Sequence, residues 1–172
     1  VLKALSLILT PIVQRVLGTR CTHLKDHGGI RGAVKRVKSS LPGYKHVIQS
    51  DVKSFYQSMR PDIVMSHCKQ IIKDKRILNL IHQYLTRCEV KDGDHRLVEQ
   101  GIPKGCPLSP LLGALMLKSL DSSIPEEALY VRYMDDWVIA VKTKSQLRRM
   151  VKTMHRVMHR LKFELALDKT FI

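Results

Sequence analysis

Three aspartates that lie far apart in the sequence are the residues best suited to chemistry. Asp135 and Asp136 stand side by side between two apolar runs of strand type, and Asp51 lies in the strand-like run 46–52. Taken alone, an aspartate pair between strands is most often a polar turn. Carboxylates about 4 Å apart, however, repel by roughly 4 kcal/mol at an effective dielectric of about 20. Mg²⁺ relieves such repulsion, and two such ions can support an in-line phosphoryl displacement.

The residues around the aspartate pair predict a β-hairpin. Residues 129–134 alternate between two faces, and residues 137–141 are almost wholly apolar, as in a strand covered on both sides. We therefore expect Asp135 and Asp136 at the tip of the hairpin. One face of the first strand should carry Leu129, Val131 and Tyr133, and the other Tyr130, Arg132 and Met134.

The order of the elements predicts how Asp51 reaches that tip. From residue 44 onward we expect a strand at 46–52, helices at 61–72 and 74–87, a small hairpin turning at 91–94, a loop over 100–107, a helix capped by Ser109 with its body at 111–120, the 129–141 hairpin, a helix at 147–161 and a strand at 163–167. Without the inserted helices and small hairpin this is a βαββαβ, or ferredoxin-like, unit. The fold class is then α+β with an antiparallel sheet in which the first strand lies beside the later hairpin.

Two further helices are expected at the start of the chain. Residues 1–17 have helical periodicity, with Pro11 either kinking the helix or dividing it in two. A second helix follows Gly28 and Gly29, and its basic face is either solvated or phosphate-binding. The 147–161 helix should bury a stripe of leucine, valine and methionine opposite a basic face. Its His155/His159 pair has metal-ligand spacing but lacks a third ligand, which favours a surface position.

The charge of the chain points to a polyanionic partner. Thirty Lys and Arg stand against fifteen Asp and Glu, giving a net charge of +15 and a pI of about 9.9 over 172 residues. Nucleic acid is the first candidate and an anionic membrane surface the second, although charge alone does not separate an enzyme from a passive binder.

The cysteines favour a reducing, cytoplasmic setting, because the four of them lie far apart and form no CxxC pair. Cys21, His23 and His27 are interpreted as part of a loop. No apolar run is expected to reach the length of a membrane span, and residues 1–13 show no signal peptide. Because the chain opens on Val1 within a helix, we expect it to be a fragment.

Four segments resemble, in order, the motifs of the reverse transcriptases. Residues 49–56 (QSDVKSFY) resemble motif A, and residues 100–112 (QGIPKGCPLSPLL) resemble motif B. Residues 133–136 (YMDD) are similar to the YxDD box of motif C, and residues 165–170 (LALDKT) to motif D. The opening helix and residues 28–31 (GGIR) resemble finger segments. The sequences of the motif B segment and of the GGIR segment are most similar to those of bacterial, group II intron-like enzymes.

The resemblance implies an RNA-directed DNA polymerase made of a palm and partial fingers. Residues 1–43 would be partial fingers and residues 44–172 the palm, with a finger-like insertion at about 75–107 and the thumb absent. The reaction would transfer a nucleotide from a dNTP to the 3′-OH of a DNA or RNA primer on an RNA template. It would use two Mg²⁺ ions, with Mn²⁺ as an alternative.

The resemblance also implies roles for single residues. Asp51 and Asp135 would hold both metals, with Asp136 alongside and the Val52 carbonyl assisting. Tyr56, next to Phe55, falls at the position that excludes a ribose 2′-hydroxyl; a packed aromatic is the alternative. The remaining pocket residues would be Gln100, Gly101 and Pro103 around the nucleotide and template base, Lys169 at the departing pyrophosphate unless it is merely solvated, and Arg31 and Lys25 at the triphosphate.

Two alternatives to this polymerase remain open. The first is a basic RNA-binding module that keeps the fold without activity. The intact aspartate trio argues against it, because a binder gains nothing from buried negative charge beside RNA. The second is an RNA-directed RNA polymerase. Tyr56 argues against that reading, as does a Tyr-Met pair where a glycine would precede the two aspartates.

Overall fold

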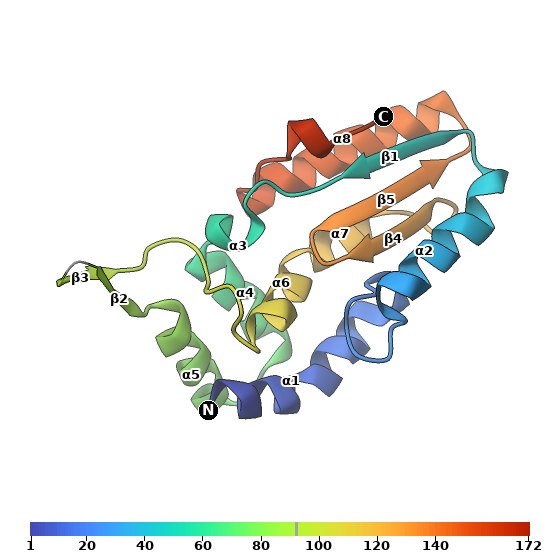
Figure 1. Cartoon of the computed structure of the whole chain (residues 1–172). Helices are drawn as coiled ribbons and strands as arrows, with labels where there is room; N and C mark the ends of the chain where they lie inside the picture. The colour runs from blue at the N-terminus through green and yellow to red at the C-terminus, as the bar shows by residue number, and fades with distance from the viewer. Residues whose placement is uncertain (92) are drawn as a thin grey trace. The chain divides into compact units, whose positions relative to one another are not determined.

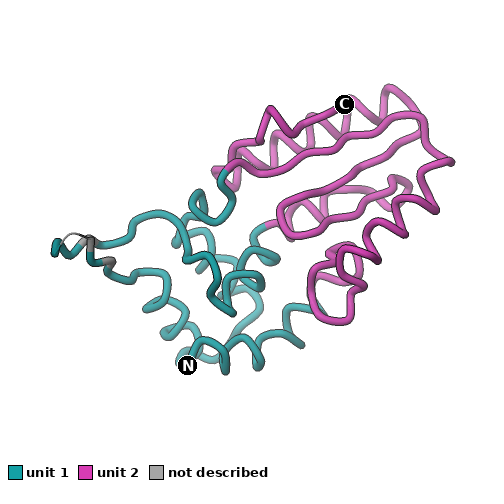
Figure 2. The backbone as a smooth tube through the Cα atoms, viewed as in Figure 1, with its two compact units in different colours: residues 1–16, 54–116 teal, residues 17–53, 117–172 magenta. Residues whose placement is uncertain are grey.

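The computed structural model describes residues 1–91 and 93–172, which form two compact units (Figures 1 and 2). Unit 1 comprises Val1–Val16 and Ser54–Met116, and unit 2 comprises Leu17–Lys53 and Leu117–Ile172. The three aspartates all belong to unit 2.

Unit 2 is built on a three-stranded antiparallel sheet with the order β1-β5-β4. Its strands are β1 (His46–Ser50), β4 (Leu129–Tyr133) and β5 (Asp136–Val141). The predicted alternation is confirmed within β4: Leu129 and Val131 pack in a cluster with Ala33 of α2 (Gly29–Ser40), whereas Tyr130 and Arg132 bond to Asp121 on the opposite face. Met134, predicted on that second face, lies beyond the strand in the turn.

Helices α7 (Lys118–Ser123) and α8 (Lys144–Leu161) cover the face of the sheet opposite α2 (Figure 1). The predicted stripe of α8 is confirmed as core, since Met150, Met154 and Val157 are each at most 2% exposed. Helix α8 begins with a capping box in which Thr143 and Gln146 each accept a hydrogen bond from the other's backbone N–H.

Unit 1 is mainly helical. Its elements are α1 (Leu2–Leu17), α3 (Phe55–Ser58), α4 (Pro61–Ile71), α5 (Lys75–Leu85), β2 (Cys88–Lys91), β3 (Asp94–Leu97) and α6 (Ser109–Met116). Helix α4 packs against both α5 and α6. The predicted small hairpin is present as β2 and β3, but its turn over 91–94 includes Asp92, which lies outside the described residues.

The final strand predicted over 163–167 is wrong. This segment does follow β1, with backbone bonds from Lys53 N to Glu164 O and from Ala166 N to Asp51 O, both 2.9 Å. A 3₁₀ turn, η3 (Leu167–Lys169), then interrupts the pairing, because the Ala166 carbonyl accepts from the Lys169 amide (3.0 Å) and the Thr170 hydroxyl (2.8 Å). Pairing with β1 resumes only at Phe171.

For the first helix the structure excludes one of two predicted alternatives, and a second helix prediction needs correction. Pro11 does not divide α1; Leu7, whose carbonyl loses its helical donor, is 63% exposed, so water can take the donor's place. The single helix expected over 111–120 is two helices, because Leu117 leaves the helical conformation. Ser109, the predicted cap, lies inside α6, and its hydroxyl donates instead to the Pro103 carbonyl (2.6 Å).

One helical stretch, Leu2–Arg20, is long and apolar enough to cross a membrane by length and composition alone. The expectation that no apolar run reaches this length is therefore wrong. The core helix of a soluble protein and a signal sequence meet the same criterion, and 22% of this stretch is buried, Leu5, Leu9 and Val13 included.

Candidate functional site

The register of the sheet brings the three aspartates together in unit 2. Strand β1 pairs with β5 so that Ser50 lies opposite Trp137, and the same register carried one residue further places Asp51 opposite Asp136. Strand β4 ends with Tyr133 paired to Asp136. The turn therefore consists of Met134 and Asp135. Asp136 had been predicted at the tip of the hairpin, but it is the first residue of β5.

The carboxylates interact strongly. Partial burial raises the pKa of Asp135 to about 6, and the charges of Asp51 and Asp136 add to the increase. The side-chain interaction with Asp51 raises the pKa of Asp135 as well. The pKa of Asp136 is raised by partial burial and by the charge of Asp51, and lowered by Lys169. Negative charge at this corner of the sheet is thus under-compensated.

Asp51 is the most enclosed member of the group, at 5% exposed. Its Oδ2 accepts a hydrogen bond from Lys169 Nζ at 2.7 Å, whereas its buried Oδ1 has no hydrogen-bond partner. The Lys169 side chain is 62% exposed, yet its ammonium is ion-paired, and that contact raises the pKa of Lys169. The interpretation of Lys169 as merely solvated is therefore wrong.

The donor chemistry of this corner fits a hard cation. It offers carboxylate oxygens, one of them buried and without a donor, beside the buried Val52. Across residues 1–91 and 93–172, however, no group of three or more His, Cys, Asp or Glu side chains is already arranged to hold a metal. The metal-binding roles of Asp51, Val52, Asp135 and Asp136 thus stay predictions.

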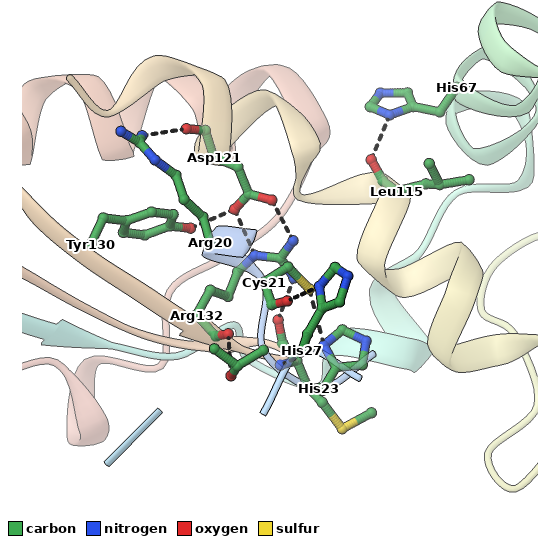
Figure 3. A network of polar contacts seen from close by, with 11 residues as sticks. Arg20, Cys21, His23, His27, His67, Leu115, Asp121, Tyr130 and Arg132 are labelled. Carbon is green, nitrogen blue, oxygen red and sulfur yellow. Dashed lines mark hydrogen bonds and ion pairs between the residues drawn. The ribbon is translucent and has the colours of Figure 1, made fainter. Parts of the chain in front are cut away.

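The turn that carries Asp135 is clamped from both sides. Met134 has a positive φ of 56°, which non-glycine residues adopt rarely. Its N–H donates to His23 Nδ1 (3.1 Å), and its carbonyl accepts from Arg132 Nη1 (2.8 Å) (Figure 3). These two bonds hold the backbone conformation from which Asp135 projects.

A buried ion pair supports this clamp. Arg132, 0% exposed, donates through Nε and Nη2 to the two carboxylate oxygens of Asp121, at 2.7 and 2.5 Å (Figure 3). The Tyr130 hydroxyl donates to the same carboxylate at 2.7 Å, and Thr22 holds the Arg132 carbonyl. Sequence analysis missed this network. An arginine on the inward face of an apolar strand demands a buried acid, and that signal could have pointed to Asp121.

The Cys21, His23 and His27 segment is a loop, as predicted, but it contributes to the site. Cys21 Sγ lies 3.2 Å from His23 Nδ1, and a His27 ring nitrogen lies 2.8 Å from the Cys21 carbonyl (Figure 3). Burial raises the pKa of the Cys21 thiol to about 11, so the thiol is neutral. The loop thereby positions His23 against Met134.

Unit 1 brings together most of the residues predicted for the nucleotide pocket. The rings of Phe55 and Tyr56 lie 5.4 Å apart, and the Tyr56 carbonyl accepts from the Ile102 amide (2.8 Å). Gly101 has φ +89°, and a Cβ there would lie 3.1 Å from the Gln57 carbonyl oxygen, so the close approach requires glycine.

The other predicted pocket residues are placed as follows. Gln100 Nε2 donates weakly to the Ser58 carbonyl (3.4 Å), and the Pro103 carbonyl accepts from Ser109. Phe55 is 4% exposed, which makes its ring part of the core. Arg31 and Lys25 belong to unit 2, where both side chains are exposed.

Asp136 borders a groove in unit 2 that could receive a ligand. Its volume is about 480 Å³, and it lies between α2 and the β-sheet. The groove is lined mainly by apolar side chains, among them Ile30, Val34 and Val138. Its polar groups include Asp136, Gln49, Lys38 and Tyr133.

The chain is similar in sequence to known proteins. The family model described as “Reverse transcriptase (RNA-dependent DNA polymerase)” matches residues 1–172. Protein YkfC of Escherichia coli (strain K12) is 24% identical, over 99% of this chain and 55% of that protein. The Group II intron-encoded protein LtrA of Lactococcus lactis subsp. cremoris is 22% identical, over 93% of this chain and 26% of LtrA.

Among solved structures, telomerase from Candida albicans in complex with a TWJ fragment of telomeric RNA is similar, with a TM-score of 0.75 at 13% sequence identity. The match covers 99% of this chain and 34% of the telomerase chain. At this identity the likeness concerns the fold, and it confirms the expected α+β polymerase palm with helical fingers. The chain spans about half the length of YkfC and smaller shares of the other two proteins.

Proposed function

Because the chain belongs to the reverse transcriptase (RNA-dependent DNA polymerase) family, we propose that it supplies the catalytic carboxylates of an RNA-directed DNA polymerase. The reaction adds a deoxynucleotide to a primer 3′-OH on an RNA template. The observation that carries the proposal is the convergence of Asp51, Asp135 and Asp136, with an unpartnered buried oxygen on Asp51 and a raised pKa on Asp135. A site that only bound RNA would be weakened by this negative charge.

In this proposal the carboxylates of Asp51 and Asp135 would hold two Mg²⁺ ions, and Asp136 and the Val52 carbonyl would assist. When bound, these ions stabilise charge on the attacking and leaving oxygens. Lys169 Nζ, which donates to Asp51 Oδ2 at 2.7 Å, would be the group that donates a proton to the departing pyrophosphate. The clamp on Met134 keeps Asp135 in place throughout.

The substrates are assigned by the same family membership. We propose RNA as template, DNA or RNA as primer and dNTPs as nucleotide donors. Residues 1–43 would act as partial fingers and residues 44–172 as the palm. Gln100, Gly101 and Pro103 would border the nucleotide, and Arg31 its phosphates.

Primer extension tests the metal assignment. A protein carrying this segment, given an RNA template, a DNA primer, dNTPs and Mg²⁺, should lose extension by about 10²-fold or more on Asp135→Asn, because a metal ligand is worth several kcal/mol in the transition state. The matched control is Asp26→Asn, an exposed residue with φ +65°, a conformation that Asn tolerates. Extension by the Asp135 variant at the wild-type rate would refute the assignment.

Sugar selection tests Tyr56, whose side chain is half-buried in unit 1. Tyr56→Ala should raise incorporation of ribonucleotides relative to deoxynucleotides by tenfold or more, on the order of a pocket's steric discrimination. Tyr56→Phe keeps the ring and should leave selection unchanged. The ratio of kcat/KM for a matched rNTP and dNTP measures the effect. Equal ratios in the Ala variant and the wild type would remove Tyr56 from this role.

A further inference from the structure

The exposed face of α8 is unusually basic. Residues 142–162 contain eight Lys and Arg, two His and no Asp or Glu. Within this stretch, Lys144, Arg148, Lys152, Arg156 and Arg160 recur at every fourth position, and all five are exposed. These five residues are called the α8 basic row.

The row winds gradually around the outer side of α8, because residues four apart are offset by about 40° around a helix, and packing fixes the orientation of that side. Four residues of α-helix rise about 6 Å, so the row extends for about 24 Å. The opposite side of α8 is held against the rest of unit 2 by Met150, Met154 and Val157, each at most 2% exposed. Helix α8 packs against β1 and β5, so the row points away from the sheet.

The charges of the row are costly and largely uncompensated. Like charges four residues apart destabilise a helix, whereas a merely solvated face usually alternates acids with bases. Among the described residues, the ion pair recorded for α8 joins Arg149 to Glu127 (3.0 Å), and Arg149 is not a member of the row. The four successive like-charge pairs therefore do not stabilise α8, and their presence calls for another role.

The chemistry of the row selects its ligand. No Phe, Trp or Tyr occurs in α8, so the row has no platform on which unpaired bases could stack. Regularly spaced cations without such rings suit the sugar–phosphate backbone of a duplex. A helix that lies on a membrane needs its apolar side open to lipid, and that side of α8 is buried.

We propose that the α8 basic row binds the backbone of double-stranded RNA, at a surface separate from the carboxylate site. The carboxylates lie just beyond β1, in the β4–β5 turn and at the start of β5, whereas the row runs along the outer side of α8. The choice of RNA over DNA rests on the proposed function. The row would hold a folded part of the RNA while another part is copied.

Salt-dependent binding tests the proposal. The chain is titrated with a fluorescent 20-base-pair RNA duplex, and log Kd is followed against log salt concentration. Each lost phosphate contact lowers the slope by about one, so the triple variant R148Q/K152Q/R156Q should lose about three. The matched control K3Q/K45Q/K73Q removes the same charge from exposed positions outside α8 and should keep the wild-type slope. Circular dichroism checks that α8 is intact, since Gln is a good helix former.

Other outcomes would overturn the proposal. An equal loss of slope in both triple variants would mean that RNA responds only to net charge. Unchanged RNA binding with lost binding to phosphatidylserine vesicles would make the row a membrane surface. Equally tight, row-dependent binding of a DNA duplex of the same length would overturn the choice of RNA.

The carboxylate site is tested separately. Asp135→Asn should bind the RNA duplex as the wild type does. If primer extension fails in every protein but the row variant still loses slope, the proposed function is wrong and the row proposal stands.

Discussion

At the scale of single residues, the site consists of partly buried carboxylates whose negative charge is not fully neutralised. Burial is the first cause of the raised pKa of Asp135, ahead of the charges of Asp51 and Asp136. Lys169 compensates one oxygen of Asp51 and leaves the other without a donor. A corner in this state favours any cation that can approach the carboxylates.

The raised pKa of Asp135 predicts how stability depends on pH. Folding raises this pKa from 3.8 to about 6, so the folded state binds the proton more tightly. The resulting stabilisation is present below pH 4 and is lost as the pH rises to about 6. Without metal at pH 7.5, Asp135→Asn should raise the free energy of unfolding by about 1–2 kcal/mol, a figure reduced for solvent screening.

Urea unfolding in EDTA at pH 4 and pH 7.5 measures this effect. The gain in unfolding free energy caused by Asp135→Asn should vanish at pH 4, and Asp26→Asn should show no gain at either pH. A variant that is more stable yet inactive would separate loss of chemistry from loss of fold. A loss of stability at pH 7.5 would contradict the assigned direction of the pKa shift.

At the scale of elements, the β4–β5 hairpin depends on support from outside itself. A two-residue turn with a methionine at positive φ is unfavourable by sequence alone. It is held by Arg132 on the hairpin and by His23 on the preceding loop. Asp121 of α7 then fixes Arg132. The conformation of the turn therefore depends on the contact between the sheet and α7.

Breaking this ion pair should be strongly destabilising. Arg132→Met leaves Asp121 buried and unpaired, which should cost about 3–5 kcal/mol of unfolding free energy. The double variant Arg132→Met/Asp121→Leu removes both charges and should be more stable than the single one, although the Tyr130 hydroxyl then loses its acceptor.

Urea unfolding of both variants checks this prediction. The control is Arg149→Met, whose exposed pair with Glu127 should contribute less than about 1 kcal/mol. If the double variant were less stable than Arg132→Met, the pair would not be the source of the loss.

At the scale of the whole molecule, a net charge of +15 surrounds a small acidic corner. Within unit 2 the carboxylates of Asp51, Asp135 and Asp136 gather where strands end, with Lys169 beside them, and the cations of the α8 basic row lie along another element. Such an arrangement suits a protein that must attract a polyanion and also concentrate metal ions. The chain spans about half of YkfC and less of LtrA, and the activity of the whole protein is a proposal.

Much of this could be predicted from the sequence, because local patterns depend on neighbouring residues. The alternation of β4 and the stripe of α8 follow from periodicity, and both are confirmed. The family resemblance, read from four ordered motifs, is also confirmed.

Only the tertiary structure decided the features that join distant residues. The sequence leaves open that Lys169 pairs with Asp51, 118 positions away, or that Asp121 neutralises Arg132. The sequence also predicts a regular strand through Leu167, whereas a 3₁₀ turn over Leu167–Lys169 interrupts the pairing with β1 and brings Lys169 to Asp51. Periodicity specifies which face of an element is apolar, whereas register and packing determine which polar groups meet, and the chemistry of this site depends on that meeting.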